Sequence, residues 1–170
     1  EKYYQEFLNV PIDPHNAYFK ETDFLEMEDQ DFDKPKNYYA AVDFAISGNS
    51  RADRTVITVG GVDSDNTLNI EYVLIGRWDA KQIVDEMISV QRRFDIDIFT
   101  VESGMIEKSI GPYLNDEMMR TGVFLNLNKE VPTKDKETRA RSIQARMRAG
   151  GVKFDTEASW YDELHDEMLV

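Results

Sequence analysis

The sequence contains no cysteine, only two histidines and no long apolar run. Without cysteine, disulfide bonds, thiolate zinc sites and cysteine nucleophiles are excluded. His15 and His165 are too few and too far apart for a zinc motif, and there is no GxxxxGK[ST] phosphate loop. No apolar run approaches the roughly 20 residues that span a bilayer, and the first residues lack the layout of a signal peptide. A soluble intracellular protein is therefore expected.

The length and composition predict one domain with appendages. With 170 residues, of which 41% are hydrophobic, the chain can build a core, but a second full domain would crowd the usual size range. Residues 1–37 mix aromatic and acidic residues with three prolines and show no sustained period, so they are expected to form a linker or leader. The domain proper is expected over residues 38–170. The start at Glu1, without methionine, suggests a fragment of something longer.

The net charge of −13 at first argues against a nucleic-acid partner, because Lys and Arg drive binding to phosphates. The distribution of the charge weakens that argument. Residues 129–153 hold eight bases and three acids, whereas residues 1–37, 38–128 and 154–170 each carry a net charge of −6. One basic segment therefore lies within an otherwise acidic chain.

Alternating apolar residues predict three antiparallel strands at the start of the domain. In the segment Tyr38–Ile46, the alternation places Val42 on one face and Asp43 on the other. Turn residues separate this segment from two further strands, over residues 55–62 and 68–78. The three strands are expected to form a meander.

Helices and strands alternate after this meander. The expected elements are a helix capped by Asp79, a strand over 95–102, a helix ending at Gly122 and disturbed by Pro112, a strand over 123–128, a helix from Thr133 to Ala149, a short extended piece at 152–154 and a helix over 157–169. This order predicts an α/β fold. Its mixed five-stranded sheet has three antiparallel strands, then parallel ones, with helices on both faces.

Two acidic residues mark a candidate catalytic and metal site. If the first and fourth predicted strands pair in parallel, Asp43 and Glu102 lie beside each other. Adjacent carboxylates repel unless a proton or a cation relieves them, and hard oxygen ligands suit Mg²⁺ or Mn²⁺. Apolar residues flank Asp43, and a buried carboxylate needs a partner or a metal. The ordinary alternatives are a turn aspartate and a glutamate at a helix start. The chemistry that fits is phosphodiester hydrolysis.

Four segments in this order resemble the nuclease domain of phage large terminases, the motors that package and cut viral DNA. They are VDFAISGNSRADRTVITVGG, IFTVESGMIEKSI, KDKETRARSIQARMRAGGVKF and SWYDELHDEML. The resemblance implies a ribonuclease-H-like fold in which Asp43 and Glu102 match two metal ligands, with two Mg²⁺ or Mn²⁺ ions in the complete site. Upstream, QEFLNVPID is similar to the stretch that leads out of the ATPase domain of the motor.

The sequence departs from the family at its third acid. The family carries this acid on a helix after the segment that matches SWYDELHDEML, and the chain stops at Val170, before that point. The triplet His165-Asp166-Glu167 is not a convincing substitute for this acid. Trp160, Leu164 and Met168 have the spacing of an amphipathic helix, so the triplet is expected to belong to a helix that packs on the sheet. The domain is therefore expected to be truncated or disordered at its C-terminal end, with the third ligand beyond Val170.

Four further residues are weaker candidates. Asp53 resembles an acid often found at the entrance to the second strand in the family, and a turn aspartate is the alternative. At 100° per residue, Lys134, Arg141 and Arg148 form one stripe on the basic helix and are candidates for binding DNA, with a solvated charged face as the alternative. The turn Asp63-Ser-Asp65-Asn is similar to the opening of a calcium-binding loop. Leu68 and Leu74 stand where that loop needs glycine and glutamate, so a hairpin turn is expected instead.

The leading prediction is a metal-dependent endonuclease domain of a viral packaging motor that cuts duplex DNA. The resemblance implies double-stranded DNA, an upstream ATPase domain, a portal ring and a small terminase subunit as partners, no membrane, and the host cell cytoplasm as location. Two alternatives stay open. One is another ribonuclease-H-like nuclease of the resolvase or integrase type, and the other is a non-catalytic module that docks on DNA or on the portal.

Overall fold

Three antiparallel strands form the centre of the structure, as their alternating sequence predicts. The computed structural model describes residues 18–44, 54–131 and 136–169. Strand β2 (Lys36–Asp43) pairs with β3 (Thr55–Asp63), which pairs with β4 (Leu68–Gly76). The turn between β3 and β4 is a hairpin in which the Asp63 carboxylate accepts the backbone N–H groups of Asp65 and Thr67. The meander and its hairpin turn are confirmed.

The other four strands add to both edges of this meander. Strand β5 (Ile98–Glu102) pairs in parallel with β2, and β6 (Leu127–Glu130) pairs in parallel with β5. On the other edge, β7 (Val152–Phe154) and β1 (Leu25–Glu26) follow β4, also in parallel. The order is β1-β7-β4-β3-β2-β5-β6. The predicted mixed sheet is confirmed, but it has seven strands among the described residues instead of five.

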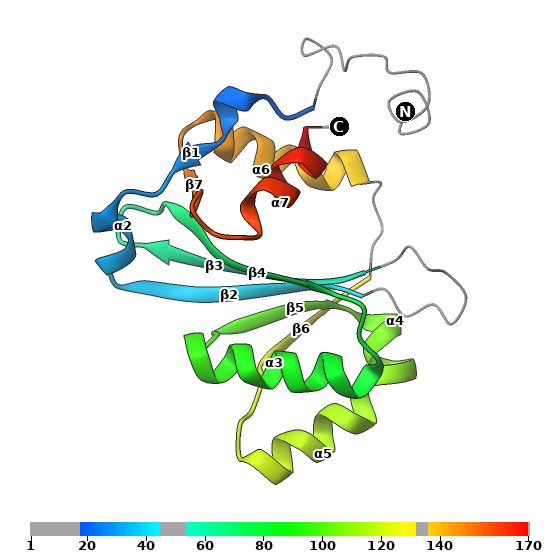
Figure 1. Cartoon of the computed structure of the whole chain (residues 1–170). Coiled ribbons are helices and arrows are strands. Elements are labelled where there is room, and N and C mark those ends of the chain that lie inside the picture. Colours follow the sequence, from blue (N-terminus) through cyan, green and yellow to red (C-terminus); the bar gives the residue numbers. More distant parts are fainter. Residues whose placement is uncertain (1–17, 45–53, 132–135, 170) are drawn as a thin grey trace.

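One face of the sheet is covered by α3 (Ala80–Phe94), and α5 (Gly111–Thr121) lies beyond α3 on the same side, as Figure 1 shows. The Asp79 carboxylate caps α3 by accepting the Gln82 N–H, as predicted. The second predicted helix is divided into α4 (Ser103–Met105), a π-helical turn (η2, Ile106–Ile110) and α5. Pro112 lies in the first turn of α5, where its missing N–H costs no hydrogen bond. Gly122 ends that helix at a φ of 68°.

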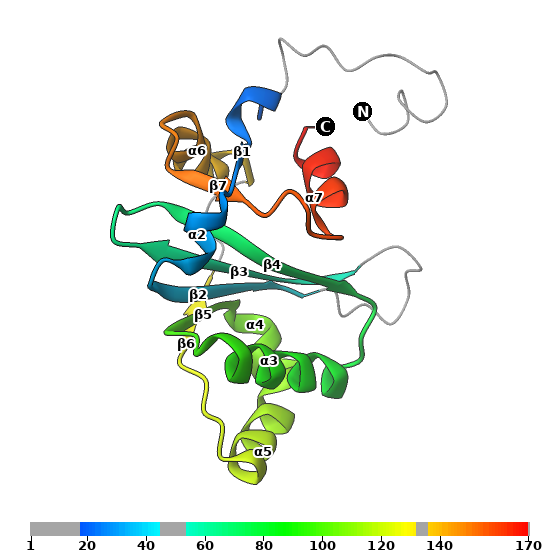
Figure 2. The same ribbon diagram turned by 60° about the vertical axis from the view of Figure 1, so that its left-hand side comes forward.

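The opposite face is covered by α6 (Lys136–Arg148) and α7 (Tyr161–Met168), and Figure 2 shows both helices above β4 and β7. A second hydrophobic cluster lies beneath them. It contains Met147 of α6 and Trp160 before α7, with Leu164 and Met168 partly buried against it. The amphipathic face predicted from Trp160, Leu164 and Met168 is therefore confirmed, and the His165 triplet lies on a helix that packs on the sheet.

Residues that the sequence assigns to a leader take part in the fold. A 3₁₀ turn (η1, Glu21–Asp23), β1 and α2 (Asp29–Asp33) precede β2. Phe19 and Met27 are buried. The folded part therefore begins before Tyr38. The apolar residues of this acidic segment are buried next to β7, with which β1 pairs. The upstream ATPase domain from which the leader is expected to come stays a prediction.

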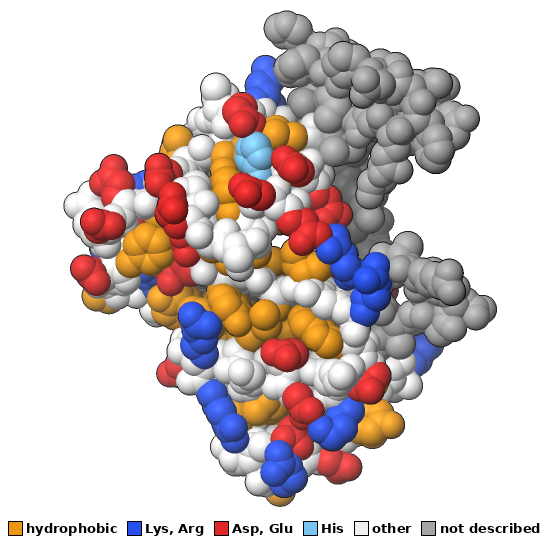
Figure 3. Space-filling view, in the orientation of Figure 1, with side chains coloured by type: hydrophobic (Ala, Val, Ile, Leu, Met, Phe, Trp, Pro, Cys, Tyr) orange, Lys and Arg blue, Asp and Glu red, His pale blue; other side chains and the backbone are white. Residues whose placement is uncertain are grey.

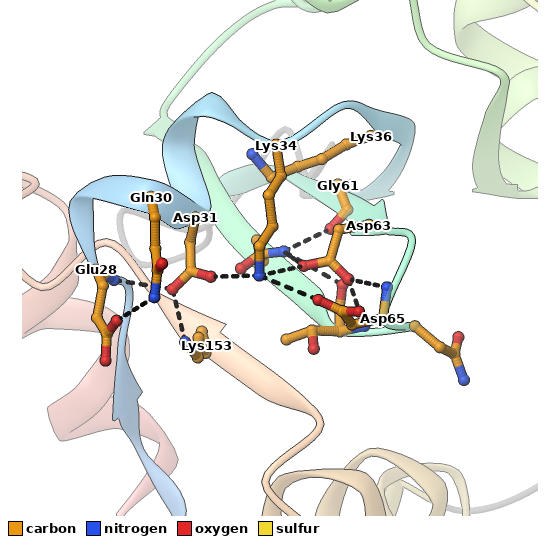
Figure 4. Close-up of polar contacts among 12 residues, drawn as sticks. Glu28, Gln30, Asp31, Lys34, Lys36, Gly61, Asp63, Asp65 and Lys153 are labelled. Carbon is orange, nitrogen blue, oxygen red and sulfur yellow. Dashed lines mark hydrogen bonds and ion pairs between the residues drawn. The ribbon is translucent and has the colours of Figure 1, made fainter.

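A network of ion pairs fastens α2 to the sheet (Figure 4). The Asp31 carboxylate, 1% exposed, contacts Lys34 Nζ at 3.1 Å and Lys153 Nζ of β7 at 2.6 Å. Lys34 Nζ also lies 3.2 Å from Asp65 and 3.7 Å from Asp63. Because a buried carboxylate is costly unless it is paired, this network fixes where the N-terminal segment meets the sheet.

Candidate active site

Asp43 and Glu102 lie side by side at the carboxyl ends of neighbouring parallel strands. In the register between β2 and β5, Val42 is the Cα partner of Val101, and each acid is the next residue of its strand. Neighbouring strands run roughly 5 Å apart. The parallel pairing on which the sequence prediction depended is therefore present, and it brings the two acids together.

Both acids point to the same face of the sheet. Val42 and Val101 are buried in the core beneath α3. Because side chains alternate along a strand, Asp43 and Glu102 point to the opposite face, and both are exposed. The argument that Asp43 is buried among apolar neighbours is therefore wrong. Its neighbours in the sequence belong to the other face.

The exposure of the two acids follows from how little α6 and α7 cover. The cluster under these helices draws its strand residues from β3, β4 and β7, and none from β2, β5 or β6. The face of β2 that carries Asp43 is open also at Tyr39, which is 39% exposed. The described part of the chain thus leaves the acids accessible to a large substrate.

Glu130 is a third acid in the same row, and sequence reasoning missed it. It ends β6 as the Cα partner of Glu102, and it accepts a hydrogen bond of 3.1 Å from the Asn128 side chain. The signal was available, since the predicted strand 123–128 is followed by Lys129 and Glu130. The prediction ended this strand two residues early, so Glu130 fell in a loop.

The donors at this end of the sheet suit a hard divalent cation. Carboxylate oxygens on two neighbouring strands are the ligands that Mg²⁺ and Mn²⁺ prefer, and a cation would relieve their mutual repulsion. No group of three or more His, Cys, Asp or Glu side chains among the described residues is close enough to hold a metal. The residues therefore fit part of a metal site, with two carboxylates in place.

The remaining candidate residues are not gathered at this pair. Asp53 and Lys134 lie outside the described residues. Arg141 is exposed on α6. Arg148 faces the N-terminal segment, where its guanidinium lies 3.8 Å from Asp23 and donates to the Tyr18 carbonyl. The role of the basic stripe in DNA binding stays a prediction, and Arg148 has a structural contact as well.

His165 has structural partners. Its Nε2 lies 2.9 Å from Glu21 of η1, and its ring contacts Phe24 and Tyr161. This histidine therefore joins α7 to the N-terminal segment, in agreement with a packing role for the helix.

Basic residues also lie at the end of the sheet that carries the acids. Arg54 precedes β3, Arg77 follows β4 and Lys108 lies in η2, just after β5, and all three are exposed. Figure 3 shows Lys and Arg side chains next to acidic ones near this end of the sheet. A polyanion approaching Asp43 and Glu102 would therefore meet positive charge close by.

Comparisons with known proteins find similarity in structure but not in sequence. No protein-family model and no curated protein sequence matches the chain. No described helix is long and apolar enough to cross a membrane.

Several solved structures share the fold. The large terminase of bacteriophage HK97 matches with a TM-score of 0.57 and 12% identity over 79% of this chain and 32% of that one. The large terminase nuclease of thermophilic phage G20c matches at 0.53 and 15%, over 76% and 63%, and its magnesium-bound form at 0.51. The yeast mitochondrial Holliday junction resolvase Ydc2 matches at 0.52 and 11%, over 79% and 73%.

These matches cover most of this chain but only part of each terminase. The chain spans about a third of the HK97 terminase and less than two thirds of the G20c nuclease. The identities are low in every case, so it is the path of the chain through the sheet and helices that is shared. The chain therefore has the ribonuclease-H-like fold of viral large-terminase nuclease domains, as its sequence segments predict.

Proposed function

We propose that the chain is a divalent-metal-dependent DNA endonuclease domain of a viral large terminase. The observation that supports this most is the place of Asp43 and Glu102, side by side and exposed at the carboxyl ends of β2 and β5. Ligands and substrates of open α/β sheets bind outside the carboxyl ends of parallel strands. This end of the sheet carries the two carboxylates and the exposed basic residues Arg54, Arg77 and Lys108.

In this proposal Asp43 and Glu102 hold Mg²⁺ or Mn²⁺ and keep it at the open face of the sheet. When bound, such ions activate water and stabilise the charge that develops on a phosphodiester. No protein nucleophile is required. A third acid beyond Val170 completes the ligand set, as the family resemblance implies. Exposure of the pair leaves room for a duplex, and the flanking cations offset the negative charge of the chain.

The terminase role carries further proposals. Duplex DNA is the substrate, an ATPase domain precedes this domain in the parent chain, and a portal ring and a small subunit are the other partners, in the cytoplasm of the host cell. Tethering to a motor that holds the DNA would supply the local concentration that an acidic domain cannot obtain from charge alone.

Cleavage of two substrates tests the proposal. The domain, extended past Val170 so that the third acid is present, is incubated with closed-circular duplex DNA and, separately, with a four-way junction, in Mn²⁺ and in EDTA. Because a closed circle has no ends, nicked or linear product identifies an endonuclease. We expect Mn²⁺-dependent cutting of the circle. Cutting of the junction alone would favour the resolvase alternative. Metal-independent binding without any cutting would favour a docking module.

Glu130 gives a prediction about metal affinity. Its charge lies one strand beyond Glu102, so Glu130→Gln should weaken Mn²⁺ binding, while leaving the two proposed ligands in place. For an exposed charge at 5–10 Å from a divalent ion, we expect an effect of roughly 2- to 5-fold in Kd. Titration calorimetry of both proteins measures it. An unchanged Kd would show that Glu130 does not contribute to the field at the site.

A further inference from the structure

Arg54 lies next to the proposed catalytic pair and on the same face of the sheet. Val56 is the Cα partner of Asp43, and Arg54 precedes Val56 by two residues, roughly 7 Å along an extended chain. A step of two residues returns a side chain to the same face. The side chain of Arg54 contacts α7, which covers that face, and this contact agrees with the register.

The partner of Arg54 is a single carboxylate on α7. Arg54 Nη1 donates to Glu163 Oε1, across 109 residues of sequence. The side chains are 37% and 46% exposed. An ion pair exposed to this extent adds little stability, because water screens both charges. Glu163 can therefore be replaced by another anion at low cost.

The position of Glu163 is fixed by the rest of α7. Tyr161 and Leu164 pack against the hydrophobic cluster, so the helix cannot turn without exposing apolar surface. The remaining faces of this helix are acidic, with Asp162, Asp166 and Glu167. A carboxylate is thus held beside the guanidinium of Arg54, at the end of the sheet that carries Asp43.

We propose that Arg54 binds a backbone phosphate of DNA next to Asp43 and Glu102, and that Glu163 occupies this arginine until DNA displaces it. This inference rests on the proposed function, since it takes duplex DNA as the substrate. A backbone phosphate can replace the carboxylate because its oxygens, like those of a carboxylate, accept two parallel hydrogen bonds from one guanidinium. Glu163 then acts as an anionic mimic that lowers the DNA affinity of the free domain.

A purely structural ion pair makes a different prediction. If the pair only fastens α7 to β3, removing either partner has the same effect on the protein, and neither change strengthens DNA binding. If Glu163 competes with phosphate, the two substitutions act in opposite directions. The sign of the Glu163 effect therefore separates the two roles.

The experiment measures binding of a fluorescently labelled duplex by anisotropy in EDTA, over a series of NaCl concentrations. Arg54→Ala should weaken binding roughly 3- to 10-fold and reduce the slope of log Kd against log salt by about one, as expected for one lost phosphate contact. Glu163→Gln should tighten binding roughly 3-fold or more, because phosphate no longer competes with a carboxylate. In the double variant the gain should vanish, since the arginine is gone.

A second Arg–Glu ion pair provides the control. Arg120 and Glu117 form this contact on α5, on the other side of the sheet, with the arginine exposed and the glutamate half-buried. Glu117→Gln should leave the DNA affinity unchanged, and circular dichroism checks that each variant is folded. Equal DNA affinity of wild type and Glu163→Gln would overturn this inference and leave the nuclease proposal standing. Absence of DNA binding by the wild type even at low salt would overturn both.

Discussion

Asp43→Asn should abolish Mn²⁺-dependent cleavage of closed-circular DNA while leaving the fold intact. The substitution keeps the size of the side chain and removes one of two charges at the carboxyl ends of β2 and β5. Loss of residues that merely orient metal ligands typically costs 10- to 100-fold in activity, so loss of a ligand should cost at least about 100-fold. The rate of appearance of nicked and linear DNA measures the effect. Glu102→Gln should behave in the same way.

Asp97 offers a control just before β5, the strand that ends at Glu102. It is an exposed acid at the amino end of β5, the opposite end from the proposed site. Asp97→Asn removes the same charge from the protein as Asp43→Asn but should leave cleavage within about 2-fold of wild type, since surface substitutions away from special features are nearly neutral. Cleavage at the wild-type rate by Asp43→Asn would contradict the assignment of this residue.

Asp31→Asn should be the most destabilising polar substitution in the N-terminal segment. It leaves two lysines, Lys34 and Lys153, without the carboxylate that both contact. Removing one partner of a fully buried ion pair costs 3–5 kcal/mol, and because the two lysines are 30% and 23% exposed, we expect about 2–3 kcal/mol. Urea unfolding at neutral pH measures the difference. Asp29→Asn, an exposed neighbour on α2, should change stability by less than about 0.5 kcal/mol.

The effect of Asp31→Asn should depend on pH. Burial raises the pKa of Asp31, but hydrogen bonds from Lys153, the Glu28 N–H and Lys34 outweigh burial and hold the pKa well below its usual range. A carboxyl group with a depressed pKa in the folded state stabilises the protein above its unfolded pKa, about 4. That stabilisation is lost as the pH falls further. The stability difference between wild type and Asp31→Asn should therefore shrink below about pH 4, and a constant difference down to pH 2 would contradict this account.

The local periods of the sequence were sufficient to predict the centre of the fold. Alternation around Val42 predicted β2, and the Asp79 cap predicted the start of α3. The edge of the sheet could not be predicted in the same way, because β1 is two residues long and its burial pattern shows no alternation. It is held by pairing with β7, which is distant in sequence and therefore gives no local signal.

The candidate site was predictable where it depended on strand order and not where it depended on coverage. The order of elements allows β2 and β5 to pair in parallel, and on that condition Asp43 and Glu102 could be placed together. The exposure of Asp43 depends on which strands α6 and α7 cover. The spacing of apolar residues predicts which face of a helix is buried, but not which strands that face packs against. The contact between Arg54 and Glu163 likewise joins residues that only the tertiary structure brings together.

Binding of Mn²⁺ to the folded chain tests the central claim most directly, because it does not require that the site be complete enough for catalysis. Titration calorimetry is carried out on wild type, Asp43→Asn, Glu102→Gln and the Asp97→Asn control. We predict saturable binding by wild type and the control, and loss of that binding in both Asp43→Asn and Glu102→Gln. Mn²⁺ binding of equal affinity in all four proteins would contradict the claim that these two acids hold the metal.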